Sequence, residues 1–157
     1  MSELLHGQAL HWASCDAAGV VTAALQSMLR ERLAEESVRL RLWLAASPGQ
    51  VPQIATAQPL GLALWVMHQA AELPEICRAL PPTRAQPRPP LCLCFLGLGV
   101  DRRRAECAAI LLESGAQVVV DELPSLQSAL PGILRAAPRS QQGYHPLTAG
   151  LVERLPW

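Results

Sequence analysis

The sequence predicts one α/β domain with a five-stranded parallel sheet that has helices on both faces. Short apolar segments alternate with longer amphipathic or charged segments along the first 137 residues, and the inner apolar segments contain almost no polar residues. Continuous apolar runs of this kind are typical of parallel strands that are buried on both faces. Right-handed crossovers then predict a doubly wound sheet in the strand order 2-1-3-4-5.

In the first part of the chain, two strands flank a long helix. Residues 10–13 are short and apolar, and residues 16–39 have alanine and leucine at helical spacing and a charged end. Ser14 or Asp16 is expected to cap this helix, because both are favourable N-cap types. Residues 38–47 alternate arginine with leucine before they become wholly apolar, which indicates a strand near the edge of the sheet.

The rest of the chain continues the alternation. Residues 47–59 hold three prolines and little periodicity, so they form either a loop or one short irregular helix. Gly115 is expected to stop the helix before the last strand, and Pro131 is expected to break the last helix. The remaining expected strands are 60–67, 91–99 and 116–120, the remaining expected helices are 70–80, 101–114 and 123–137, and residues 81–90 are a proline-rich connection.

The composition excludes several classes of protein. The 157 residues are half hydrophobic, which is enough for a core without disulfides or metal, and the formal charge of zero leaves no basic block for nucleic acid. Five cysteines, an odd number, lie in apolar runs and follow no signal peptide, so we expect a reduced cytoplasmic protein. The longest apolar run is far shorter than the roughly 18 residues that a membrane-spanning helix needs.

The segment LLESGAQVVVDELPSL, residues 111–126, carries the most informative local pattern. It places Gly115 and Ala116 between a helix and a strand, and Pro124 after the strand. It resembles the passage from the fourth helix through the fifth strand in the receiver domains of bacterial response regulators, and LPEICRAL resembles the helix after their third strand. The resemblance implies a flavodoxin-like receiver domain over residues 1–137, followed by a C-terminal extension over 138–157.

Receiver chemistry needs charged groups at the carboxyl ends of the strands, and this chain departs from that requirement. The family uses an acidic pair to hold Mg²⁺, an aspartate after the third strand as nucleophile, a hydroxyl after the fourth and a lysine after the fifth. The corresponding positions here are Asp16, His68, Gly97 and Glu122. One carboxylate replaces the acidic pair, the nucleophile and the hydroxyl are missing, and an acid stands where the lysine would be.

The resemblance therefore implies a degenerate receiver, or pseudo-receiver, without aspartyl phosphorylation. Such domains act through their surfaces, so we expect a non-catalytic regulatory or scaffolding protein that binds another protein or an identical subunit, for instance as a homodimer. No catalytic residue, cofactor, metal, nucleic acid or membrane is expected. This expectation follows from an analogy of fold.

A small phosphoryl-transfer enzyme or carrier that uses Cys15 or His68 is the alternative. Cys15 is expected at the start of a helix, which lowers a thiol pKa and favours anions, and its loop resembles the cysteine loop of sugar phosphotransferase-system subunits. His68 could serve as phosphoacceptor or general base, although the sequence shows no evident partner carboxylate for it. The simpler interpretations are a small, partly buried cysteine and a polar loop histidine.

Three further features have a functional and a structural interpretation. Cys92 and Cys94 lie two apart on a strand and share a face, so they either bind a metal with ligands from elsewhere or pack in the core, which is the usual outcome on a central strand. Arg102, Arg103 and Arg104 lie at a helix start, where positive charge opposes the helix dipole. They either bind an acidic partner or form a solvated face.

The C-terminal extension gathers several aromatic residues around LTAGLVERL, which has the length of about two helical turns. Tyr144, His145 and Trp157 are the expected interaction residues, because tyrosine and tryptophan are favoured anchors at interfaces. The extension is expected to dock on this domain or an identical subunit, or to bind a different partner.

Overall fold

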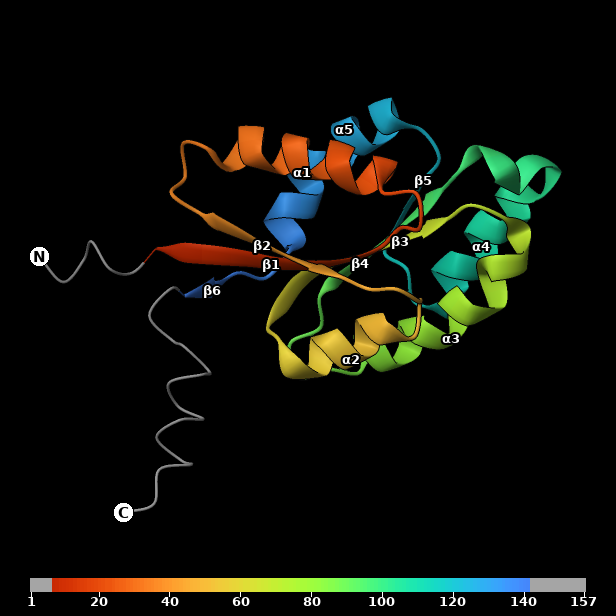
Figure 1. The fold of residues 1–157 in the computed structure, drawn as a ribbon, viewed down its shortest axis with the longest axis horizontal. Helices are drawn as coiled ribbons and strands as arrows, with labels where there is room; N and C mark the ends of the chain where they lie inside the picture. The colour runs from red at the N-terminus through yellow and green to blue at the C-terminus, as the bar shows by residue number, and fades with distance from the viewer. Residues whose placement is uncertain (1–6, 142–157) are drawn as a thin grey trace, which may run out of the picture.

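A computed structural model describes residues 7–141 and shows a parallel sheet between two layers of helices (Figure 1). The strand order is β2-β1-β3-β4-β5 and all pairs between these strands are parallel, so the predicted doubly wound fold is confirmed. The strands are β1 (Gln8–Cys15), β2 (Arg39–Leu44), β3 (Leu60–Met67), β4 (Leu91–Leu96) and β5 (Val118–Val120), and a short β6 (Ser140–Gln141) pairs antiparallel with β1.

The helices divide between the two faces of the sheet (Figure 1). One face is covered by α1 (Val20–Leu33) and α5 (Leu123–Ala136), and the other by α2 (Gln50–Ala57), α3 (Leu73–Arg84) and α4 (Arg104–Ser114). Alternate side chains of β3 enter the two cores, and every residue of this strand is buried. Burial on both faces explains why the sequence of the inner strands is apolar throughout.

The tryptophans of the strands show the same division. Trp12 and Trp65 are fully buried in opposite cores, and Trp43 packs against the core that holds Trp65. The region 47–59, for which the sequence left a loop or a helix open, contains the helix α2. Among residues 7–141, no helix is long and apolar enough to cross a membrane.

Two helices contain prolines at positions where the sequence predicts a helix end or a break. The expected break of the last helix at Pro131 is wrong, because α5 continues through it, and α3 includes Pro81 and Pro82. An interior proline costs a helix about 3 kcal/mol. Both helices bury apolar side chains against the sheet around these prolines, including Leu80 and Leu130, and this packing outweighs the cost.

Two helix starts also differ from the prediction. The N-cap of α1 is Gly19 rather than Ser14 or Asp16, although Asp16 still accepts a hydrogen bond from the amide of Thr22 in the first turn. The expected helix at 101–114 is divided into a 3-10 segment, Leu98–Arg103, and α4 from Arg104. The backbone breaks at Asp101, where φ is 39°.

Gly61 in β3 lies where the chain crosses the sheet after α5. A Cβ atom at this position would overlap the carbonyl oxygen of Pro138 and lie 2.7 Å from Cδ1 of Leu10. Pro138 therefore lies close against β3, and Ser140 then pairs with Ala9 of β1.

Gly61→Ala is expected to lower the free energy of unfolding by about 1–3 kcal/mol, because the added methyl group meets a backbone oxygen that cannot turn aside. The matched control is Gly49→Ala, since a Cβ at Gly49 meets no atom within 4 Å. Urea unfolding followed by circular dichroism measures both. Equal midpoints for the two variants would contradict the close approach of Pro138.

Candidate functional site

The carboxyl ends of the parallel strands bring together residues that are distant in the sequence. Asp16 follows β1, His68 follows β3, Gly97 follows β4 and Asp121 follows β5. The ends of β3 and β4 are joined directly, because the amide of Gly97 donates to the carbonyl oxygen of Met67 at 2.8 Å. Ligands of doubly wound folds bind at this end of the sheet, so the residues here form the candidate site.

Asp16 is the most enclosed charged group at this end, with a side chain only 1% exposed. Its Oδ2 accepts hydrogen bonds from the amide and the hydroxyl of Thr22, both at 3.0 Å. The Thr22 hydroxyl also lies 2.6 Å from the hydroxyl of Ser14, and both residues are buried. These contacts fix the first turn of α1 against the end of β1.

His68 completes this network from the neighbouring strand. Its Nε2 lies 2.9 Å from Oδ1 of Asp16, and its side chain is 32% exposed. The main chain is held as well, because the amides of His68 and Gln69 donate to Oε2 of Glu72 at 2.6 and 3.2 Å. The sequence showed no partner carboxylate for His68, and the structure provides one in Asp16.

The protonation of this pair follows from its hydrogen bonds. Burial alone would raise the pKa of Asp16, but hydrogen bonds from Thr22, His68 and the amide of Gly19 lower it overall. Asp16 is therefore ionised at neutral pH and can only accept hydrogen bonds. Nε2 of His68 must then carry the proton that the two residues share.

Cys15 has none of the properties of an activated nucleophile. It is partly buried, and burial together with the carboxylates of Glu72, Asp16 and Glu75 raises the pKa of its thiol to about 11. A helix start would lower the pKa of the thiol, but Cys15 does not lie at one, because α1 begins only at Val20. At neutral pH the thiol stays protonated, and the reactive form of cysteine is the thiolate.

Arg104 contacts the strand ends, in contrast to Arg102 and Arg103. Its guanidinium donates to the carbonyl oxygens of Gly97 at 2.8 Å and Leu96 at 3.4 Å, and it lies 3.5 Å from a carboxylate oxygen of Asp121. It thus connects the ends of β4 and β5. Arg102 and Arg103 are exposed. The sequence identified the run but gave no signal that one member turns towards the strand ends.

The remaining residues singled out in the sequence lie apart from this network. Cys92 and Cys94 are buried in the core beside α3 and α4, and burial raises the pKa of both, that of Cys92 to about 12. Within residues 7–141, no three His, Cys, Asp or Glu side chains are grouped so that they could hold a metal ion. Glu122 is exposed in front of α5. Tyr144, His145 and Trp157 lie outside the described residues.

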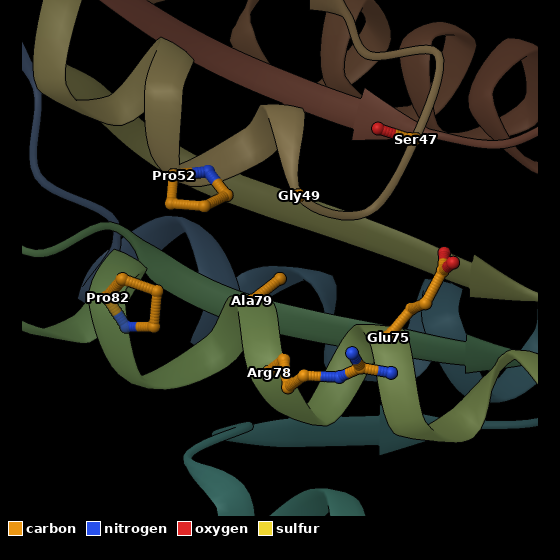
Figure 2. A pocket seen from close by; sticks show the side chains of 7 residues that line it. All are labelled: Ser47, Gly49, Pro52, Glu75, Arg78, Ala79 and Pro82. Carbon is orange, nitrogen blue, oxygen red and sulfur yellow. The ribbon is translucent and has the colours of Figure 1, made fainter.

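A separate groove of about 420 Å³ lies between α2 and α3. Pro52 and Pro82 flank one part of it, and Glu75 and Arg78 project from α3 along another (Figure 2). No sequence motif marks these residues. The groove has no residue in common with the network around Asp16.

Asp16→Asn is expected to lower stability at neutral pH by about 1–3 kcal/mol, because a buried ionic hydrogen-bond acceptor becomes neutral. It should also flatten the acid dependence. The folded-state pKa of Asp16 is depressed, so its contribution is complete above the unfolded value of about 3.9 and is lost as the pH falls through the folded value.

Urea unfolding at about pH 7 and about pH 3 measures both effects. Glu106→Gln is the control, because Glu106 forms only an exposed pair with Arg103 and its replacement should change stability by less than about 0.5 kcal/mol. An acid dependence of Asp16→Asn as steep as that of the unmodified protein would contradict this role of the carboxylate.

Comparisons with known proteins identify the fold. No protein-family model and no curated protein sequence matches the chain. Among solved structures, the receiver domain of the sensor histidine kinase PA1611 from Pseudomonas aeruginosa, solved with a magnesium ion in its active-site cleft, matches with a TM-score of 0.51 and 18% identity, covering 83% of this chain and 97% of that one. A protein described as the pilus assembly protein CpaE, from Burkholderia thailandensis, matches with a TM-score of 0.48 and 19% identity over 81% of this chain and 98% of that one.

At these identities the likeness concerns the fold alone. The strand order, the placement of the helices and the match to the PA1611 domain agree with one another. The chain has the flavodoxin-like fold of receiver domains.

Proposed function

We propose that this chain is a non-catalytic regulatory or scaffolding module that binds a protein, either a different one or an identical subunit, through the carboxyl end of its sheet. We further propose that it does not accept a phosphoryl group on an aspartate and that it works in the cytoplasm. The observation that carries the proposal is the location of the exposed apolar side chains.

Four of the five large apolar side chains that are exposed in residues 7–141 lie at one end of the molecule. They are Leu44 at the end of β2, Val20 at the start of α1, Leu98 after β4 and Leu123 at the start of α5. Leu98 is 90% exposed and Leu44 is 74% exposed. Exposed apolar groups that gather at one end of a domain support a protein interface there, because binding removes them from water.

The chemistry of the same end supports the second part of the proposal. His68 follows β3 where the receiver nucleophile would be, and the side chain of Asp16 already accepts hydrogen bonds from Thr22 and His68 and is closed to solvent. Asp121 and Glu122 add negative charge after β5, where an incoming phosphoryl group needs a cation. The alternative of phosphoryl transfer through Cys15 loses support from the raised thiol pKa.

Leu98→Ser is expected to reduce the recovery of a bound partner at least about tenfold, because it removes an apolar anchor from the proposed interface. The experiment uses the full chain, a pull-down from the native cell and sedimentation to detect binding between identical subunits. Leu112→Ser is the matched control, since Leu112 is 50% exposed near the C-terminal end of α4, at the opposite end of the sheet. Partner recovery that is equal for both variants would contradict an interface at the carboxyl end.

Incubation with acetyl phosphate and Mg²⁺ is expected to leave no alkali-labile phosphoryl group on an aspartate. The physical reason is that His68 follows β3, where a receiver has its aspartate, and that the carboxylate of Asp16 is enclosed and already hydrogen-bonded. Intact-mass measurement before and after mild alkali treatment tests this, and tandem mass spectrometry locates any adduct. An alkali-labile phosphoryl group on Asp16 or Asp121 would overturn the second part of the proposal.

A further inference from the structure

His68 has one occupied ring nitrogen and one that no hydrogen bond reaches within residues 7–141. Nε2 is bound to Asp16 at 2.9 Å. We propose that Nδ1 of His68 is a nucleophile that accepts a phosphoryl group from a small phosphoryl donor, which makes it a covalent modification site at the carboxyl end of the sheet. The modification would act on the interface of the proposed function, and only this regulatory consequence rests on that function.

The hydrogen bonds of Asp16 select the tautomer of His68. Oδ2 accepts from the amide and hydroxyl of Thr22, and Oδ1 faces Nε2 of His68. A carboxylate only accepts hydrogen bonds, so Nε2 donates and the neutral ring keeps a lone pair on Nδ1. A carboxylate that holds one imidazole nitrogen in this way also stabilises the positive charge that develops when the other nitrogen reacts.

The hydrogen bond to Asp16 orients the ring, and the main chain that carries the ring is held in place. The amides of His68 and Gln69 are both anchored to Glu72, and the carbonyl oxygen of His68 lies against Gly99 so closely that a Cβ there would overlap it. Fixed orientation matters because a nucleophile that is already aligned loses little freedom in the transition state.

Gly97 leaves the region beside Nδ1 open. A Cβ atom at Gly97 would lie 3.7 Å from Nδ1 of His68 and 3.1 Å from the carbonyl oxygen of Met67. Gly97 has no side chain that could cover Nδ1, and the side chain of His68 is 32% exposed.

Arg104 brings positive charge to the same loop. Its Nη2 donates to the carbonyl oxygen of Gly97 at 2.8 Å, and its contact with the half-exposed Asp121 is longer, at 3.5 Å. A phosphoryl group on Nδ1 would compete with Asp121 for this guanidinium, because phosphate oxygens bind arginine strongly. The acidic groups nearby, Glu72 and Asp121, oppose the added charge, so the arginine is the compensating partner.

Phosphoramidate is the phosphoryl donor in the proposed step. The lone pair of Nδ1 attacks phosphorus, the new N–P bond forms, the P–N bond of phosphoramidate breaks and its nitrogen leaves as ammonia with the protons that it already carries. The imidazole becomes a phosphoimidazolium, which keeps the proton on Nε2 and its contact with Asp16. The added negative charge would lie beside the exposed Leu98 and would weaken binding of an apolar partner surface.

The test incubates the full chain with phosphoramidate and measures the intact mass under alkaline conditions, in which phosphohistidine is stable. One phosphoryl group is expected, stable to alkali and removable by mild acid, and tandem mass spectrometry should locate it on His68. Asp16→Asn should form the adduct at least about tenfold more slowly, because the tautomer is no longer fixed.

His11→Gln is the matched control and should keep the adduct, since Nδ1 of His11 already accepts a hydrogen bond from Nε1 of Trp43 at 3.3 Å. His68→Gln should lose the adduct. No adduct on the unmodified protein, or an adduct located on another residue, overturns the proposal, and this result does not depend on the folding of any variant.

Failure of this proposal and failure of the proposed function give different results. Adduct formation on His68 needs no partner, and capture of a partner through Leu98 needs no adduct. An alkali-labile group on an aspartate contradicts the proposed function, whereas an alkali-stable group on His68 supports only the proposed modification of His68.

Discussion

The burial of one carboxylate, that of Asp16, governs the arrangement of the carboxyl end of the sheet. A charge removed from water destabilises a protein unless hydrogen bonds and opposite charge compensate it. Thr22 and His68 provide this compensation, one from the first turn of α1 and the other from the end of β3. The hydrogen bonds of the Asp16 carboxylate thereby connect β1, α1 and β3. They also determine that Nε2 of His68, rather than Nδ1, faces Asp16.

Much of the fold was predictable because burial on both faces leaves a clear mark in the sequence. The strand expected at 60–67 coincides with β3, since nothing but apolar residues can occupy a strand between two cores. Two of the mistakes concern helices with prolines. Local preference argues against continuing through Pro131, and only the packing of residues such as Leu130 and Ile133 on the sheet explains why α5 does so. The pairing of β6 with β1 carried no local signal in its two residues.

The residues of the candidate site could be predicted from the sequence, but the contacts between them could not. Asp16 and His68 could each be identified because they directly follow apolar strands. Their contact spans 52 positions and depends on the register of β1 with β3, which composition does not reveal. The inward turn of Arg104 depends on the backbone break at Asp101, and an arginine run looks the same whichever member turns inward.

The pairing of Gln141 with Gln8 brings the two ends of the described chain together beside the amino end of β1. The network around His68 lies at the other end of the same strands (Figure 1). A domain whose two ends are adjacent can be inserted into a loop of a host protein, because the two junctions then lie close together. The surface around His68 lies far from these junctions. The geometry therefore suits this domain to the construction of fusion sensors in which His68 and Leu98 face away from the host.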